Sequence, residues 1–367
     1  MSDITLPVSL GEALDKLTIL DIKLQKISDE RKADVKKEYD LLMASLAPYV
    51  TAYSYHYRIL REVNLSIWNI QDVFHVADYN VENGSDMYKQ ILLENDRRFR
   101  VKAKINALAN SALREQKGYA KKRAFIYTHL GLGDMFWMNG AVRYLATAYD
   151  EVAVVCKERN KANVAAMYAD DPTIHPFVID DDYVLYPFPA KRQLIEAQGM
   201  TVYACGQHVP APIRDFPHSF YDDFGLDRSV RSRYFHVPEL PEAVQLYAAV
   251  SAISPTYIVV HEQSSTKTLP IWDHVNQNKE TILILDVNKN HYHSCHPFYL
   301  AAEHVVGKPL LHYKTLLENA TEIHLLESSL YCFASHLDLS AVKGRYCYDA
   351  YDNSNERLGV FETARLT

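Results

Sequence analysis

Four groups of residues in this chain fall at the carboxyl ends of apolar runs of strand length. They are, in chain order, Gly131–Asp134, Cys205–His208, Ser264–Lys267 and Glu327–Ser329. Apolar runs that alternate with helical patterns are typical of parallel α/β sheets. Because such sheets bind ligands at the carboxyl ends of their strands, these four groups are the first candidates for a binding site.

The group after the apolar run 257–260 combines three hydroxyls with one cation. Ser264, Ser265 and Thr266 supply the hydroxyls, and Lys267 supplies an ammonium group. Hydroxyl donors and lysine are common partners of phosphate oxygens. This turn therefore predicts a site for the diphosphate of a nucleotide, with an ordinary serine-rich loop as the alternative.

The group after 322–326 opens a helical pattern with one carboxylate and two hydroxyls. Glu327 can hold ribose hydroxyls, and Ser328 and Ser329 stand where a helix start presents N–H groups to phosphate. His261 ends the strand pattern that begins at 257. We expect Glu327, Ser328 and Ser329 to bind the nucleotide. His261 either contacts the ligand or has only a structural role.

The first group is a glycine turn. Gly131 and Gly133 precede a helical pattern that runs from 135 to 149. Such a turn brings backbone N–H groups and a helix start close to a ligand, and Asp134 stands at its mouth. Two roles are open for this carboxylate: contact with a ligand, or only capping of the helix, which contributes about 1 kcal/mol.

Residues 1–119 predict a separate helical region. Apolar residues recur at helical steps over 9–47, Pro48 ends that pattern, and further helices are expected over 53–76 and 88–116. The third helix carries five basic residues, namely Arg97, Arg98, Arg100, Lys102 and Lys104. They form either a solvated face or a face for an acceptor or partner, and these helices are also a possible contact in a homo-oligomer.

Residues 120–240 and 241–367 each predict one α/β lobe, with Pro238–Pro241 as the linker. In both, strand-length apolar runs alternate with helices. The predicted fold class is therefore α/β, with two facing Rossmann-like lobes preceded by an all-helical N-terminal region. Ligands are expected in the cleft between the lobes.

Composition limits the class of partner. Residues 1–123 hold 20 Lys and Arg against 17 Asp and Glu, whereas the remainder holds 19 against 29. An acidic α/β part does not favour nucleic acid as a partner. The five cysteines show no Cys-x-x-Cys spacing, and the sequence shows neither a signal peptide nor an 18-residue apolar stretch. These features predict a cytoplasmic protein without a membrane span.

Two segments are candidates for metal binding, and neither is favoured. Asp180–Asp182 is an acidic run after a strand pattern and is expected to be a solvated turn. His291, His293 and His296 lie in one loop, where a polar surface is the alternative to a metal site. We therefore predict no metal ligand and no cofactor.

The order of motifs in the first lobe resembles a known family. Gly131–Asp134, followed by Ala141–Leu145 and Glu151–Cys156, resembles the N-terminal lobe of GT-B glycosyltransferases of the heptosyltransferase-like family (glycosyltransferase family 9). The sequence departs from the family at Gly140, where the family has proline. Separately, the N-terminal segment Pro7–Leu20 resembles the start of an uncharacterised bacterial family, which adds no chemistry.

The second lobe adds to this resemblance. Val259–Lys267 is similar to the family's strand and phosphate turn with a lysine, and Ile323–Leu337 is similar to its Asp-Ser/Thr-Gly-x-x-His segment. Here the family's glycine is Ser329 and its histidine is Cys332.

The resemblance implies a glycosyltransferase of glycan biosynthesis that moves a sugar from a nucleotide-diphosphate sugar to a glycan or other hydroxyl acceptor. It implies an inverting, metal-independent reaction, with Asp134 as general base and His129 of the same loop as its competitor. Lys267 and its neighbours would neutralise the leaving diphosphate. Two alternatives stay open: a nucleotide-sugar epimerase or hydrolase of the same fold, and a non-catalytic scaffold with degenerate lobes, which the missing histidine at Cys332 would fit.

Overall fold

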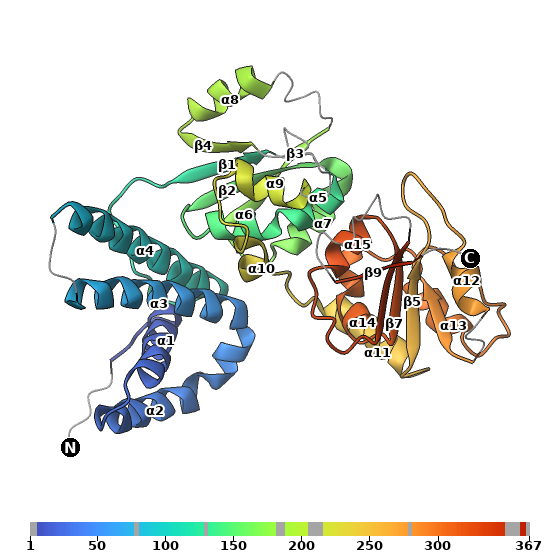
Figure 1. The fold of residues 1–367 in the computed structure, drawn as a ribbon, viewed down its shortest axis with the longest axis horizontal. Helices are drawn as coiled ribbons and strands as arrows, with labels where there is room; N and C mark the ends of the chain where they lie inside the picture. Colours follow the sequence, from blue (N-terminus) through green and yellow to red (C-terminus); the bar gives the residue numbers. More distant parts are fainter. Residues whose placement is uncertain are drawn as a thin grey trace. The chain divides into compact units, whose positions relative to one another are not determined.

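The computed structural model describes residues 6–76, 81–127, 131–180, 188–204, 216–277, 281–348 and 360–364. The chain forms two compact units (Figure 1). The first contains residues 1–124, 144–152 and 170–175, and the second contains residues 125–143, 153–169 and 176–367. Two short segments of the predicted first α/β lobe therefore fold with the N-terminal helices.

Four helices build most of the first unit: α1 (Leu10–Lys26), α2 (Arg31–Ala52), α3 (Ser54–Val76) and α4 (Val81–Leu108). The side chain of Ser9 caps α1. The single helix expected over 9–47 is instead two helices, and the Asp29 carboxylate accepts a hydrogen bond from the N–H of Arg31 where α2 begins. Pro48 lies inside α2 on its exposed side, where water can reach the carbonyl that proline leaves unpaired.

The later helices agree with their predictions to different degrees. α3 spans the range expected from 53 to 76, whereas α4 begins and ends earlier than the expected 88–116. Asn110 follows α4 with a φ of 49°, a left-handed conformation that asparagine tolerates and that often ends a helix.

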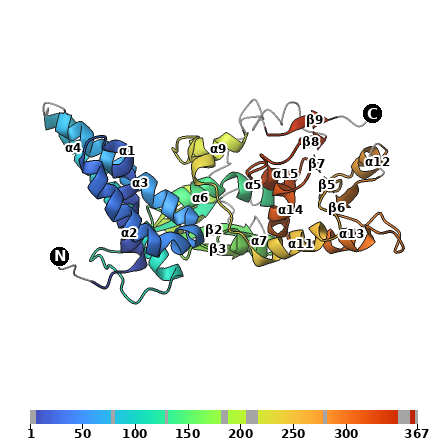
Figure 2. The same cartoon turned by 90° about the horizontal axis from the view of Figure 1, so that it is seen from below.

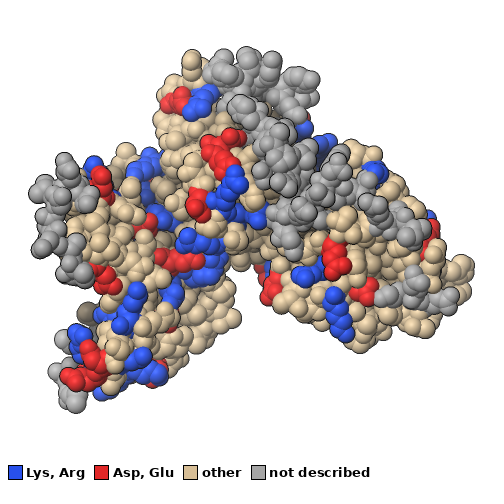
Figure 3. All heavy atoms as spheres, in the orientation of Figure 1, with Lys and Arg blue, Asp and Glu red and all other residues tan. Residues whose placement is uncertain are grey.

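The five basic residues of α4 do not form a free face. Each forms an ion pair inside the first unit, and their partners are Glu94, Asp15, Asp150, Glu12 with Glu115, and Asp171. Figure 3 agrees, because basic and acidic side chains intermingle over the helices on the face that it shows. The interpretation of these residues as a solvated face is therefore wrong, and a face for an acceptor or partner stays a prediction. An oligomer through these helices stays a prediction.

A four-stranded sheet has the order β3-β2-β1-β4. Its strands are β1 (Arg123–Tyr127), β2 (Glu151–Lys157), β3 (Ile174–Ile179) and β4 (Met200–Ala204), which lie where the apolar runs 124–128, 151–156, 174–179 and 201–205 predict strands. Helices connect successive strands, which is what parallel neighbours require. They are α5 (Leu132–Trp137), α6 (Asn139–Leu145), α7 (Lys161–Met167) and α8 (Phe188–Glu196), with a 3₁₀ turn at Glu158–Asn160.

A five-stranded sheet has the order β6-β5-β7-β8-β9, and all its neighbouring strands are parallel. Its strands are β5 (Tyr257–His261), β6 (Leu283–Asp286), β7 (Glu322–Leu326), β8 (Gly344–Tyr348) and β9 (Glu362–Ala364). The other helices of the second unit are α9 (Phe216–Asp223), α10 (Val230–Tyr234), α11 (Pro241–Ser251), α12 (Ile271–Asn276), α13 (Tyr299–Val305), α14 (Lys314–Glu318) and α15 (Ser329–Ala334), with a 3₁₀ turn at Leu310–Tyr313. The mixed α/β class and the helical region are thus confirmed, and the facing of two lobes stays a prediction.

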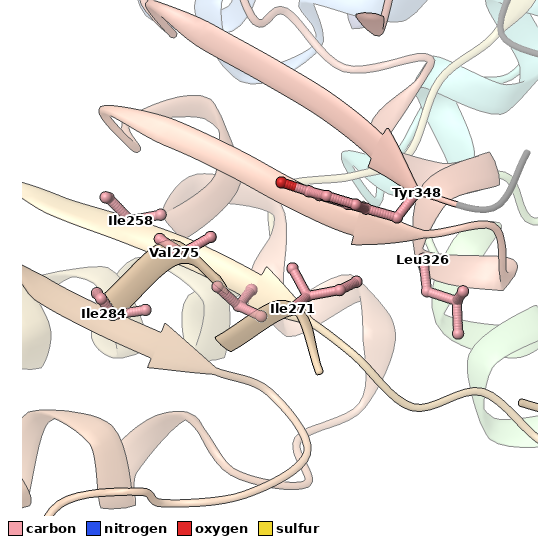
Figure 4. Packing of buried hydrophobic residues seen from close by; sticks show 7 residues of the cluster. Ile258, Ile271, Val275, Ile284, Leu326 and Tyr348 are labelled. Carbon is pink, nitrogen blue, oxygen red and sulfur yellow. The ribbon is translucent and has the colours of Figure 1, made fainter. Parts of the chain in front are cut away.

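The core of this second sheet explains its apolar sequence. β5 and β6 are buried along their whole length, so their runs carry no polar alternation. Ile258 and Ile284 of the two strands pack with Ile271 and Val275 of α12 (Figure 4). Burying each such side chain contributes about 1.5–3 kcal/mol. This packing holds α12 against β5 and β6.

Candidate functional site

Two predicted residues meet where the strand order of the five-stranded sheet reverses. The chain passes from β5 to β6 on one side of β5 and later returns to β7 on the other. His261 ends β5, and Ser328 follows β7. The Ser328 hydroxyl lies 3.1 Å from His261 Nδ1, within hydrogen-bond distance. Open α/β sheets bind ligands at such reversal points, at the carboxyl ends of the strands.

Burial determines the charge of His261. The residue is 8% exposed, and burial lowers its pKa to about 4. The imidazole is therefore neutral at neutral pH and can exchange a hydrogen bond with Ser328, but it brings no positive charge to a phosphate.

Ser328 also caps a helix. It has an extended backbone, and its hydroxyl accepts a hydrogen bond of 3.4 Å from the N–H of Tyr331 in the first turn of α15. Glu327 and Ser329 stand on either side of it and are partly buried. The predicted group Glu327–Ser329 is thus the junction between β7 and α15.

The hydroxyl and lysine turn is built on its own hydrogen bonds. Ser264 Oγ accepts from the N–H groups of Thr266 and Lys267, at 3.3 and 3.1 Å, and the N–H of Ser264 donates to the Lys267 carbonyl. Ser265, Thr266 and Lys267 are exposed. α12 begins only at Ile271, so no helix N-terminus belongs to this turn. Ser264 shapes the turn, and the three exposed residues are the ones that can reach a ligand.

The glycine turn is the first turn of a helix. Gly131 is the N-cap of α5, and Gly133 and Asp134 lie in its first turn. The Asp134 carboxylate folds back over Gly131: a Cβ atom added at Gly131 would lie only 2.6 Å from Asp134 Oδ2. A carboxylate in this position interacts favourably with the positive end of the helix, and the residue is still partly exposed. His129, the other base candidate, lies outside the described residues, as does the group Cys205–His208.

α5 and α15 pack directly against each other (Figure 2). A Cβ atom on Gly133 would lie 3.0 Å from Cys332 Sγ, and the rings of Phe136 and Phe333 stack at 4.8 Å. Gly133 thus admits the helix that carries Cys332. Since α5 follows β1 and α15 follows β7, this contact joins the predicted groups at the carboxyl ends of the two sheets.

His336, just past α15, is a residue that the sequence did not single out. Its ring stacks on Phe235 at 4.4 Å and contacts Trp137 edge-on. Burial lowers the pKa of His336 to about 3, and its Nδ1 pairs with the Cys332 carbonyl. A neutral ring packed in this way braces α15 against α5.

A second missed group lies at the ends of β5 and β6. Glu262, Asp286 and His291 bring ligand-type atoms within 4.8 Å of one another, and no other group of three that could hold a metal occurs among the described residues. Burial raises the pKa of Asp286 to about 6. His293 and His296 accept hydrogen bonds from N–H groups of their own loop, so His291 alone of the predicted histidine cluster turns towards these carboxylates.

Each of the missed carboxylates had a signal in the sequence. Glu262 directly follows His261, and Asp286 ends the apolar run that begins at 281. Both are therefore strand-end residues of the kind that drew attention elsewhere. Of the acidic run Asp180–Asp182, the described residue Asp180 is exposed at the end of β3, and the other two lie outside the described residues.

Within the parts of the chain that the structure covers, no helix combines the length and apolarity needed to cross a membrane.

Comparison with known proteins gives one partial family match. Residues 4–127 match the model of a family of unknown function (DUF6165), a range that covers the four long helices and β1. No curated protein matches the sequence.

Two solved structures share features with this chain. The crystal structure of the bacterial iron-containing dodecameric glycosyltransferase TibC from enterotoxigenic E. coli H10407 is 16% identical, with a TM-score of 0.41 over 70% of this chain and 65% of that one. The dodecameric iron-containing heptosyltransferase TibC in complex with ADP-D-beta-D-heptose is also 16% identical, with a TM-score of 0.37 over 62% and 59%. This chain spans less than two thirds of their length.

Proposed function

We propose that this protein is a glycosyltransferase that moves a sugar from a nucleotide-diphosphate sugar to a hydroxyl acceptor such as a glycan. The observation that carries the proposal is the contact between Gly133 and Cys332. Through it, a glycine turn with a carboxylate at the end of β1 adjoins the start of α15, beside the strand reversal at His261 and Ser328. A transferase needs a base on one side and a nucleotide site on the other, within reach of one reacting centre.

The proposed roles follow from the chemistry of each side chain. Asp134 removes the proton from the acceptor hydroxyl, with His129 as the alternative base. Glu327, Ser328 and Ser329 hold the ribose or phosphate of the nucleotide, and Lys267, exposed on its turn, meets the diphosphate. An in-line attack on the anomeric carbon then inverts its configuration.

A thermal-shift screen of the full chain tests the nucleotide site. Nucleoside diphosphates of the five common bases and their sugar conjugates are compared, because a ligand at 100 times its dissociation constant stabilises a protein by about 2.7 kcal/mol. We expect one base to raise the melting temperature, and Lys267→Ala to reduce that shift. A panel in which no nucleotide has an effect would contradict the proposal.

A turnover assay tests the base. Asp134→Asn keeps the size of the side chain and removes its basicity, so we expect a loss of transfer of roughly 10²-fold or more with nucleotide binding intact. Asp180→Asn, at an exposed strand end of the same sheet, is the matched control and should retain activity. Consumption of the donor without any acceptor would instead identify a hydrolase or an epimerase.

A further inference from the structure

We propose that Glu262, Asp286 and His291 form a binding site for a divalent transition-metal ion. The three side chains come from different positions around the ends of β5 and β6. Their ligand-type atoms lie within 4.8 Å of one another. His291 Nε2 is 2.8 Å from Asp286 Oδ2 and 3.5 Å from Glu262 Oε1, so one nitrogen and two oxygens converge on a single point.

The second oxygen of each carboxylate is held by the backbone. Asp286 Oδ1 accepts a hydrogen bond from the N–H of Asn288 at 2.9 Å. Glu262 Oε2 accepts one from the N–H of Trp272 at 3.1 Å. The oxygens that face His291 are thereby oriented before any ion arrives, as the outer hydrogen bonds of metal sites orient their ligands.

The imidazole is oriented by stacking. The ring of Trp272 lies parallel to that of His291, with a centroid distance of 4.3 Å and an interplanar angle of 8°. The buried indole N–H of Trp272 has no hydrogen-bond partner among the described residues. A clamped ring keeps Nε2 directed at the two carboxylates, which lowers the entropy cost of assembling the ligands.

Burial gives the cluster a reason to bind a cation. The side chain of Asp286 is 0% exposed, and those of Glu262 and His291 are each 14% exposed. Two carboxylates this close together and out of water are costly unless a positive charge faces both. A metal ion that faces all three ligand atoms would supply this charge.

The donor set indicates the class of ion. Imidazole suits zinc and other late first-row metals, whereas carboxylates also suit manganese and magnesium. Three protein ligands leave coordination positions open, as in catalytic rather than structural sites. This differs from the sequence-based expectation of no metal ligand. The loop histidines drew attention for their spacing, but the geometry joins only His291 to the carboxylates of two strand ends.

The position of the site suggests a role that rests on the proposed function. Glu262 follows His261 directly, and Asn288 accepts hydrogen bonds from the N–H groups of Glu262 and Gln263, which lead into the turn that carries Lys267. An ion here would lie on the sheet edge where the diphosphate of a nucleotide sugar is proposed to bind. Its open positions can accept phosphate oxygens and stabilise the leaving group.

Metal binding is measured on the full chain after chelation and dialysis, by calorimetry with Mn²⁺, Zn²⁺ and Mg²⁺ as separate probes. We expect one ion per chain for Mn²⁺ or Zn²⁺ and weaker binding of Mg²⁺. Glu262→Gln keeps an acceptor for the N–H of Trp272 and removes a charge, and His291→Gln removes the imidazole. Each should weaken binding at least tenfold. Melting temperatures without metal show whether each variant is folded.

His293→Gln is the matched control, because it removes a histidine of the same loop outside the cluster. It should bind as the wild type does. A wild type that binds no ion, or a loss of binding in the control equal to that in His291→Gln, would overturn the proposal. Nucleotide affinity with and without metal is measured separately. Metal binding without nucleotide binding would refute the proposed function but not the metal site. Nucleotide binding without metal binding would refute the metal site but not the proposed function.

Discussion

The pairing of α4 with the rest of the first unit predicts a large cost for one substitution, Lys104→Met. Lys104 Nζ lies 2.6 Å from Asp171 Oδ2, and their side chains are 3% and 2% exposed. Removing one partner of a buried ion pair leaves the other charge uncompensated, which typically costs about 3–5 kcal/mol. Methionine fills a similar volume, so the expected loss comes from the charge.

A double variant separates the charge from the packing. Asp171 Oδ1 also accepts hydrogen bonds from the N–H and hydroxyl of Thr173, and Asp171→Asn can keep these. The double variant Lys104→Met with Asp171→Asn should therefore lose less unfolding free energy than the two single variants added together, by about 2 kcal/mol or more. This coupling free energy measures the interaction between Lys104 and Asp171 alone, separated from the contacts that each residue makes with other residues.

Urea unfolding of the full chain, followed by both fluorescence and circular dichroism, measures these changes and shows whether the two units unfold together. Lys36→Met is the control, because its ion pair with Asp40 is exposed and should contribute less than about 1 kcal/mol. A loss of stability in Lys104→Met no larger than that of the control would contradict the predicted cost of the unpaired charge. Additive losses in the double variant would contradict it as well.

Two further predictions concern the second unit. Gly140→Ala should destabilise by about 1–3 kcal/mol in urea unfolding, since its Cβ would lie 2.6 Å from the rigid backbone oxygen of Arg231. In Gly133→Ala the nearest atom to the new Cβ, at 3.0 Å, would be Sγ of the Cys332 side chain, and the nearest backbone atom would lie 3.7 Å away, so this substitution should cost less; equal costs would contradict the difference. The pKa of His336, lowered by burial, means that the unfolded state binds the extra proton, so stability falls as pH drops from about 6.5 towards 3. His336→Phe should lose less stability over that range, and an unchanged pH profile would contradict it.

The buried strands could be predicted from the sequence because burial on both faces leaves near-continuous apolar runs. Those runs identified the buried strands β1, β2, β5, β6 and β7, whereas the predicted strands β3 and β4 are only partly buried. β8 was missed since its apolar segment, Tyr346–Tyr348, is only three residues long and follows Gly344 and Arg345, and β9 is too short to show a pattern. In the helical region, one helix was predicted across Asp29, whereas α1 ends before Ile27, whose backbone is extended, and the Asp29 carboxylate accepts a hydrogen bond from the N–H of Arg31 where α2 begins.

Residues of the site were predictable where they are local to a strand end. His261 and Ser328 could each be found in this way, but their contact depends on the pairing of β5 with β7. The cluster of Glu262, Asp286 and His291 depends in the same way on register, because Val260 pairs with Asp286 across β5 and β6. The prediction for the basic residues of α4 failed for a related reason, because a pattern of charges in the sequence does not show which Asp and Glu side chains face it after folding.

Lys267 and the proposed metal ion are two sources of positive charge for the same proposed diphosphate, and the fold links their positions. Lys267 lies on a turn that starts at Glu262, and Asn288 ties that start to the loop after β6. If the ion and the lysine neutralise one diphosphate, Lys267→Ala and Glu262→Gln should affect nucleotide affinity non-additively in the presence of Mn²⁺. Without metal, the Glu262 substitution should have little effect, and Lys267→Ala should have its full effect. Additive losses under both conditions would show that the metal cluster and the turn act on different ligands.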